Sequence, residues 1–207
     1  RESALAGHVA SPLAASPADA RVTIDEEELD VREALLGLAR TGKASLVMTE
    51  GILFVTGGVP TLHLMGIRPD GEGNVTKTHV LWHEAKQPKA VSYVPSPLAY
   101  KEWFFVVSDG VVGGGSHLTC IEAKTGKFLW MEKLGRHHSA SPVLADGLLY
   151  CPDDDGITHV AKAAPKFELV ARNPLGEQCF ASFALSRGRI YVRTLKSLWC
   201  IGAGERR

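Results

Sequence analysis

The sequence predicts an all-β protein made of several copies of one four-stranded unit. The first observation is a repeated motif, in which a serine is followed six residues later by a short apolar group that ends in an aromatic residue. The second is the even distribution of Gly-containing turns between short apolar runs, which is typical of antiparallel strands. The third is that only one stretch has the periodicity of an amphipathic helix. The motif begins at Ser45, Ser96, Ser141 and Ser182.

The spacing of the motif indicates which all-β architecture to expect. The four starts are 51, 45 and 41 residues apart, and a period of ~40–50 residues with four strands per unit is typical of β-propeller blades. The last unit ends after its third strand, and closed propellers use about 4–8 blades. We therefore predict a partial propeller of three to four blades over residues 44–207, and we expect the remaining blades in a longer full-length chain.

The N-terminal segment, residues 1–43, is predicted to contain the single helix. Acidic residues crowd its start at 25–28, where the helix dipole favours them, and Val31, Leu35 and Leu38 fall on one stripe. Thr41-Gly42 is a stop signal. The helix is interpreted as an insertion or cap on the propeller, with a small α/β module as the alternative. Ala10-Ser-Pro-Leu13 is a candidate remnant of an eroded blade.

The clearest hairpin lies around residues 118–130. Two apolar runs flank the turn Lys124-Thr-Gly-Lys127, and Gly126 suits a position that needs a positive φ. Trp130 ends the second run, and Trp82 falls at the same place in the preceding unit. Large apolar rings at a repeated position favour packing between neighbouring blades. We predict that Trp82, Trp130 and Gly126 serve this packing.

Composition excludes some classes of function. Basic and acidic residues are equal in number, at 23 each, which gives no overall positive charge to attract nucleic acid. No apolar run approaches the ~20 residues of a transmembrane helix. The four cysteines form no Cys-x-x-Cys pair and are expected to be small buried hydrophobes, which leaves their redox state open. They are Cys120, Cys151, Cys179 and Cys200.

Polar links between units are the candidate binding loops, because such links cluster on one face of a propeller. Arg136, His137 and His138 form a small cationic group in one link, which we expect on the surface; Glu177 and Gln178 occupy the matching link. These five residues are predicted to face a partner. Asp153-Asp-Asp-Gly156 is interpreted as a solvated turn, because the alternating oxygens and distant Glu of a calcium loop are missing.

Several of these segments resemble a known repeat. Ala140-Ser-Pro-Val143, Asp146-Gly-Leu-Leu-Tyr150 and the stretch from Cys120 to Trp130 resemble the repeat of pyrroloquinoline-quinone-like (PQQ-like) β-propellers. That family contains quinoprotein alcohol dehydrogenases and non-catalytic members of the outer-membrane assembly type, which the chain resembles more. The resemblance implies a periplasmic or otherwise exported location. The third unit departs from the pattern, because 163–168 replaces the Thr-Gly turn and the following Trp.

The residues favour a non-catalytic protein over an enzyme. Family enzymes often use a tryptophan floor beneath the quinone and a pair of adjacent cysteines, and the sequence has no adjacent cysteines. We predict no catalytic, cofactor-binding or metal-binding residues, and a repeat scaffold whose loops bind a protein or peptide partner in the cell envelope. One alternative is a fragment of a PQQ-dependent dehydrogenase whose active-site blades lie outside this chain. Another is the substrate-presenting domain of a sugar- or polymer-processing protein.

Overall fold

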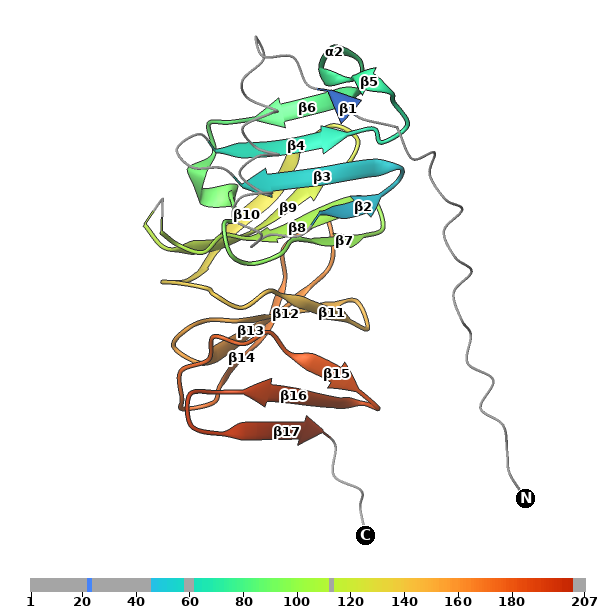
Figure 1. The fold of residues 1–207 in the computed structure, drawn as a ribbon. Coiled ribbons are helices and arrows are strands. Elements are labelled where there is room, and N and C mark those ends of the chain that lie inside the picture. Colours follow the sequence, from blue (N-terminus) through green and yellow to red (C-terminus); the bar gives the residue numbers. More distant parts are fainter. Residues whose placement is uncertain (1–21, 24–45, 58–61, 112–113, 203–207) are drawn as a thin grey trace, which may run out of the picture.

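The chain folds into four antiparallel sheets that follow one another in sequence order. The computed structural model describes residues 22–23, 46–57, 62–111 and 114–202. We number the sheets blade 1 to blade 4 (Figure 1). Blade 1 contains β2 (Val47–Thr49), β3 (Ile52–Gly57), β4 (His63–Ile67) and β6 (Val80–Glu84); blade 2 contains β7 (Leu98–Tyr100), β8 (Trp103–Val107), β9 (Ser116–Glu122) and β10 (Phe128–Gly135). Blade 3 contains β11 (Val143–Ala145), β12 (Leu148–Pro152), β13 (Ile157–Lys162) and β14 (Leu169–Pro174); blade 4 contains β15 (Ala184–Ser186), β16 (Arg189–Arg193) and β17 (Leu198–Gly202).

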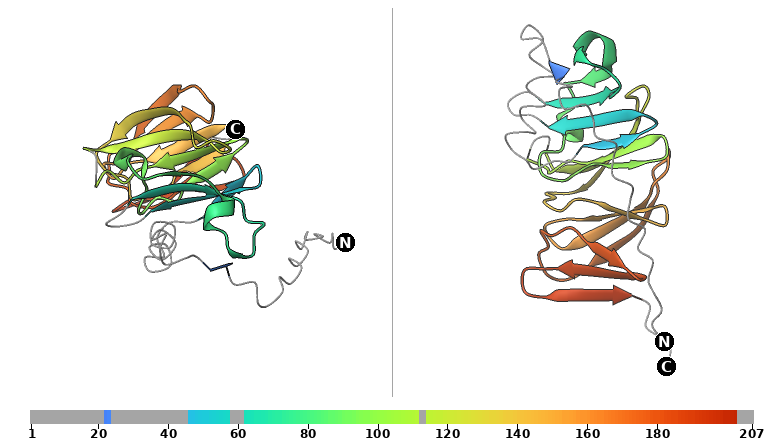
Figure 2. Two further views of the ribbon diagram at one scale, coloured as in Figure 1. Left: turned by 90° about the horizontal axis from the view of Figure 1, so that it is seen from above. Right: turned by 45° about the vertical axis from the view of Figure 1, so that its right-hand side comes forward.

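The four sheets confirm the predicted partial propeller. Blade 4 has three strands among the described residues, as expected from the sequence. Blade 1 and blade 4 lie at opposite ends of the stack in Figure 1 and in the right-hand view of Figure 2. The described blades therefore form an open row rather than a closed ring.

Tight hairpins start each blade and explain the repeated glycine. In blade 3, Asp146 and Gly147 have φ angles of 49° and 72°, and Ala145 pairs with Leu148 across the turn. Two consecutive positive φ values define the type I′ turn, which matches the twist of the strands and favours Asp-Gly. Blades 1 and 4 have the same pair of φ signs at 50–51 and 187–188. Blade 2 has Lys101 at a φ of 52° and Glu102 in place of the glycine.

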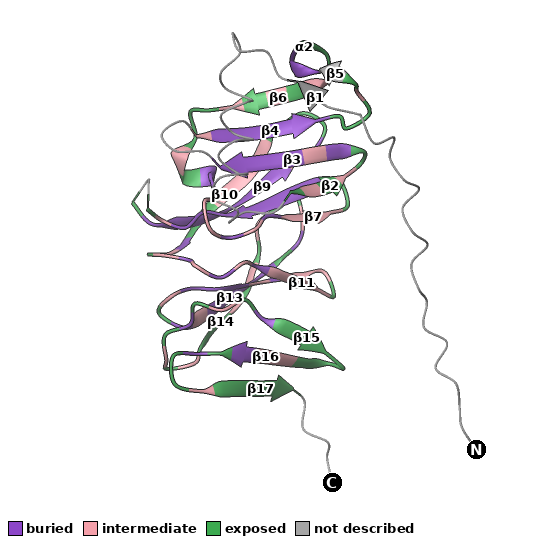
Figure 3. Ribbon diagram, in the orientation of Figure 1, coloured by how far each residue is buried: buried purple, intermediate pink, exposed green. Residues whose placement is uncertain are grey.

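The core lies between neighbouring blades, and blade 2 buries both of its faces. Alternate residues of β8 point in opposite directions: Phe104 joins the apolar cluster with Phe54 of blade 1, and Phe105 joins the cluster with Leu149 of blade 3. All four of these side chains are fully buried. Burial is concentrated in blades 1 and 2 and falls toward blade 4, most of which is exposed (Figure 3).

The serines of the repeated motif connect the starts of successive blades. Ser141 Oγ accepts a hydrogen bond of 2.9 Å from the backbone N–H of Ser96. The N–H of Ser141 in turn donates to Ser182 Oγ, also at 2.9 Å. A side-chain oxygen at this position therefore satisfies a backbone donor of the previous blade, which explains why a serine recurs there.

Smaller elements lie beside blade 1. β1 (Val22–Thr23) pairs in parallel with β5 (Gly73–Asn74), and α2 (Thr76–His79) precedes β6. The segment 68–77 between β4 and β6 thus contains β5 and the start of a short helix. A 3-10 turn, η1 (Pro88–Ala90), lies between blades 1 and 2. The helix expected at 25–40 and the candidate eroded blade at 10–13 lie outside the described residues.

The cysteines are all free, and three of them behave as buried hydrophobes. Burial, assisted for Cys120 by the charge of Glu102, raises the pKa of Cys120 and of Cys151 to about 12, so both thiols are protonated at neutral pH. Cys179 is buried as well. Cys200 is exposed on β17, which makes the expectation of burial wrong at this position. In the described part of the chain, no helix has the length and apolar character needed to cross a membrane.

Candidate functional site

One link joins blade 2 to blade 3 and another joins blade 3 to blade 4. Each link lies against the turn between the second and third strands of the blade that follows it, and the two contacts are equivalent. The N–H of Asp154 donates to His137 O at 3.1 Å, and the N–H of Leu195 donates to Gln178 O at 2.9 Å. Both members of the second contact lie 41 residues after those of the first. We call the surface formed by these two links and the adjacent turns the linker face. It gathers the predicted partner-facing residues.

A buried polar cluster lies beneath the linker face. Asp153 is 3% exposed; its carboxylate accepts hydrogen bonds from the backbone of Ile157 at 2.8 Å and contacts His159 Nε2 at 3.1 Å. Burial works to raise the pKa of Asp153, but these two hydrogen bonds and the charges of His159 and His138 together lower it. The expectation that Asp153 belongs to a solvated turn is therefore wrong, because the turn folds back onto its own blade.

His138 belongs to the same cluster and is fully buried. Its Nδ1 lies 2.7 Å from Ser116 Oγ, and its ring centroid lies 5.9 Å from that of His159. Burial lowers the pKa of His138 to about 4, against the opposing charge of Asp153. The expected surface position of His138 is thus wrong. Its side chain points inward, because adjacent residues in an extended link point in opposite directions.

Asp154 joins the link to the turn of blade 3. It contacts His137 Nδ1 at 2.6 Å and accepts hydrogen bonds from the N–H and the hydroxyl of Ser139 at 2.7 and 3.0 Å. Beside it, Arg136 donates two hydrogen bonds to the carboxylate of Asp155, at 2.8 and 3.2 Å. The side chain of Arg136 is nevertheless 84% exposed. This arrangement places Arg136 and His137 at the surface, each in contact with an acidic residue of the blade 3 turn.

Glu177 connects the second link to the turn of blade 4, as Asp154 connects the first link to the turn of blade 3. Here the acid is on the link, and it accepts hydrogen bonds from Thr194 Oγ1 at 2.6 Å and Ser197 Oγ at 2.9 Å. These hydrogen bonds lower the pKa of Glu177, which keeps the carboxylate ionised. The neighbouring Gln178 side chain is exposed. The linker face therefore displays Arg136, His137 and Gln178, while Glu177 is engaged within the protein.

The two predicted packing tryptophans each reach from the fourth strand of one blade to the next blade. Trp82 Nε1 donates to Ala123 O at 2.7 Å, and Trp130 Nε1 donates to Ala164 O at 2.9 Å. The ring of Trp82 lies against Gly66 and Gly126, where any added Cβ would overlap it. Gly126 has a φ of 71° as well. Lack of a side chain at both glycines therefore makes room for the indole between two blades.

The departure in the third unit changes the next interface. Ala164 still accepts the hydrogen bond from Trp130, and Phe167 contacts the Trp130 ring at 5.1 Å between centroids. In the register of the third and fourth strands, however, Ala171 occupies the place of Trp82 and Trp130: Val160 pairs with Ala171 as Cys120 pairs with Trp130. Blade 3 thus has no tryptophan with which to contact blade 4.

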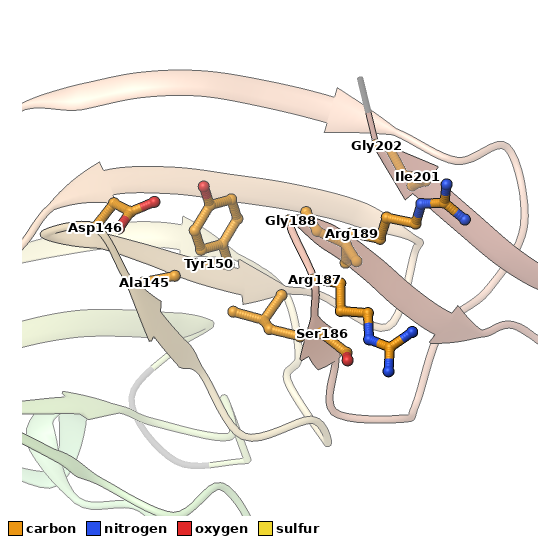
Figure 4. A pocket seen from close by; sticks show the side chains of 11 residues that line it. Ala145, Asp146, Tyr150, Ser186, Arg187, Gly188, Arg189, Ile201 and Gly202 are labelled. Atoms are coloured by element: carbon orange, nitrogen blue, oxygen red, sulfur yellow. The ribbon is translucent and has the colours of Figure 1, made fainter. Parts of the chain in front are cut away.

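A pocket of about 520 Å³ lies between blades 3 and 4, at the opposite end of the strands from the linker face. Figure 4 shows Asp146 and Tyr150 on one side of it and Arg187 on the other. Ala145 lines the pocket at the position that Tyr100 occupies in blade 2. Sequence reasoning missed this pocket. The signal was Ala145, at the position where blade 2 carries Tyr100.

Comparison with known proteins identifies a fold but not a family. No protein-family model and no curated protein sequence matches the chain. Among solved structures, BamB from Moraxella catarrhalis matches at 12% identity with a TM-score of 0.54, covering 73% of this chain and 40% of that one. The computationally designed protein Ika4 matches at 11% identity with a TM-score of 0.55, covering 78% of this chain and 91% of that one.

Quinohemoprotein alcohol dehydrogenase from Comamonas testosteroni also aligns, at 14% identity and a TM-score of 0.49, over 73% of this chain and 29% of that one. The chain spans 40% of the length of the BamB structure. The described residues hold no group of three or more His, Cys, Asp or Glu side chains placed to bind a metal ion. On the geometry of its four blades and on its similarity to BamB and Ika4, the chain has a β-propeller fold.

Proposed function

We propose that the chain is a non-catalytic propeller scaffold, and that its linker face binds a protein partner in the cell envelope. The observation that supports this is that the acidic and histidine side chains near the linker face contact other groups within the protein. Asp153 and His159 contact each other inside blade 3, Asp154 contacts the preceding link, and Glu177 contacts blade 4. These groups stabilise the loops, and the loops hold Arg136 and Gln178 outward.

Exposed residues on rigid loops are suited to recognition, because a partner does not have to order them on binding. The bidentate contact with Asp155 orients Arg136, and arginine is enriched among the residues that dominate binding energies. The periplasmic or exported location belongs to this proposal. It is inferred from the resemblance to envelope propellers, as fold alone does not fix function.

The proposal is tested by placing a photo-crosslinking amino acid at position 178 and exposing the protein to envelope extract. One identified protein should crosslink at 178, and the purified partner should bind the wild type but bind the Arg136→Glu variant at least about tenfold more weakly. Lys166→Glu, an exposed charge reversal away from the linker face, is the control and should bind normally.

A dehydrogenase fragment gives the opposite pattern. Saturable binding of pyrroloquinoline quinone with Ca²⁺ by the 207-residue chain, together with dye-linked oxidation of an alcohol, would reject the scaffold proposal. Crosslinking to many unrelated proteins with no effect of Arg136→Glu would also count against it.

A further inference from the structure

The turn between the second and third strands of blade 2 is longer than the corresponding turns of blades 3 and 4. It comprises eight residues, 108–115, whereas the other two turns, 153–156 and 194–197, comprise four each. This difference accounts for the longer spacing, 45 rather than 41 residues, between the second and third starts of the repeated motif. Blade 2 packs against a described blade on each of its faces. The exposed residues around this turn therefore do not owe their exposure to the end of the row.

Two glycines of this turn make room for a lysine of the fourth strand. Lys133 Nζ donates to Gly114 O at 2.9 Å. An added Cβ at Gly115 would lie 2.8 Å from Lys133 Cε, and Gly115 has a φ of 120°, which a residue with a side chain rarely adopts. The lysine side chain is exposed on the turn. Val111, on the same turn, is 72% exposed.

A second lysine lies close to the first, on the link between blades 1 and 2. Lys133 pairs with His117 across β9 and β10, so these two side chains are neighbours on one face of the sheet. Lys89 belongs to η1, which contacts β9. Burial lowers the pKa of His117, and the charges of Lys89 and Lys133 lower it further, against a hydrogen bond to Gly115 O and the charge of Glu132. Both ammonium groups therefore lie near the same imidazole.

No described carboxylate balances the two lysines. Neither Lys89 nor Lys133 forms an ion pair with another described residue. Glu132 directly precedes Lys133 on β10, so its side chain points to the opposite face of the sheet. Asp109, the acidic residue of the turn itself, is 5% exposed and accepts a hydrogen bond from the N–H of Val111 at 3.0 Å. The exposed charge at this place is therefore positive.

The turn of blade 2 adjoins the linker face. The N–H of His138, in the link between blades 2 and 3, donates to Asp109 O at 3.0 Å. Gly110 lies directly against the carbonyl of Arg136, where an added Cβ would overlap it. The exposed side chain of Arg136 and the longer turn therefore belong to one continuous surface.

This surface fits a negatively charged protein segment. Lys89, Lys133 and Arg136 place three exposed cations around one turn, and Val111 adds an apolar contact beside them. Opposite charge on a partner would speed its association and favour it over other proteins. Single-stranded nucleic acid is a poorer fit, because it stacks its bases on aromatic side chains and none of these four residues is aromatic.

We propose that the turn of blade 2, with Lys89 and Lys133, binds an acidic segment of the protein partner of the linker face. Carboxylates of the segment contact the two ammonium groups, and an apolar side chain next to them packs on Val111. This inference rests on the proposed function, and it adds the chemistry by which the partner is recognised.

The test uses the 207-residue chain and two short fluorescent peptides, one of alternating Glu and Val and one of alternating Lys and Val. The acidic peptide should bind saturably, and more weakly as salt is raised, while the basic peptide should not bind. A Lys89→Glu, Lys133→Glu double variant should bind the acidic peptide at least about tenfold more weakly. The control, Lys127→Glu with Lys166→Glu, makes the same change in net charge at exposed positions near the opposite ends of the strands and should bind like the wild type.

The full partner separates this inference from the proposed function. The protein that crosslinks at position 178 should also bind the Lys89→Glu, Lys133→Glu variant more weakly. Normal binding of that partner to the lysine variant, with weakened binding to Arg136→Glu, would overturn this inference and leave the proposed function standing. Crosslinking to many unrelated proteins would reject the proposed function, whatever the peptides do.

Three results with the probes would also overturn the inference. The first is no saturable binding of the acidic peptide, and the second is equal binding of both peptides. The third is tighter binding of a single-stranded oligonucleotide than of the acidic peptide. Circular dichroism of both double variants should match the wild type, so that a loss of binding reports on charge rather than on folding.

Discussion

Single residues decide how closely the blades approach one another, and the glycines show this most clearly. Gly126 and Gly51 have the same φ of 71°, but only Gly126 lies against a neighbouring ring, whereas nothing lies within 4 Å of the Cβ position of Gly51. The two positions therefore separate the effect of backbone conformation from the effect of contact between blades.

Replacing Gly126 with Ala should destabilise the protein more than the same change at Gly51. Each variant loses about 1 kcal/mol because alanine is strained at positive φ. Gly126→Ala should lose roughly 1–3 kcal/mol more, since the Trp82 ring must move. Urea unfolding of both variants measures the difference. Equal losses would show that the ring adapts freely.

The buried His138 should make stability depend on pH. Its folded pKa of about 4 lies below its ordinary 6.5, so the unfolded chain takes up a proton between these values while the folded chain does not. The free energy of unfolding should therefore fall by roughly 3 kcal/mol as the pH falls from 6.5 to 4. Asp153, with a lowered pKa, contributes stability that is lost only at still lower pH.

The measurement is urea unfolding of the wild type and His138→Gln at pH 7 and pH 4.5. The variant should be less stable at pH 7 but should lose less stability on acidification, because the titrating group is gone. The facing groups, Asp153, Asp154 and His159, are present in both proteins. The same loss in both proteins would assign the pH dependence to another group.

At the level of elements, the links fasten each blade to the next through polar side chains. Blade 4 relies on this contact more than the others do, because the tryptophan position of blade 3 is Ala171 and the apolar cluster between blades 3 and 4 has only three buried members. The hydrogen bonds of Glu177 to Thr194 and Ser197 therefore carry a larger share of the attachment.

Removing the Glu177 side chain should loosen blade 4 alone. In Glu177→Ala, the amides of β15 to β17 should exchange several-fold to tenfold faster, because the hydrogen bonds to Thr194 and Ser197 are lost. Amides of blades 1 and 2 should be unaffected. Gln178→Ala is the control, since that side chain is exposed. Uniformly faster exchange would instead show that the four blades open together.

The sequence predicted the repeated elements well, because each depends on local chemistry. Asp146-Gly147 specifies its turn, and the motif serines Ser96, Ser141 and Ser182 connect the starts of blades 2, 3 and 4. The linker face was predicted only in part. His138 lies in the link between β10 and β11, and Asp153 lies in the turn between β12 and β13. Both are buried because this link packs against this turn, which brings together residues far apart in the sequence. The positive charge around the turn of blade 2 was hidden by the neutral total.

As a whole molecule, the row of blades should behave as a one-dimensional array, in which each unit is stabilised mainly by its neighbours. A chain truncated after Leu175 loses the least buried blade but keeps the clusters around Phe54 and Phe105. It should remain folded by circular dichroism, with a smaller urea m-value because less surface is exposed on unfolding. Loss of all cooperative unfolding would show that blade 4 is required by the rest.

The serine contacts between blade starts have a consequence for how such a chain can change over time. Ser141 accepts from the blade before it and donates to the blade after it, so each unit presents one matching half-contact on either side. A duplicated or deleted unit therefore leaves two compatible ends at the junction. Unequal recombination within the gene can lengthen or shorten the row by whole units while keeping this serine contact at the junction.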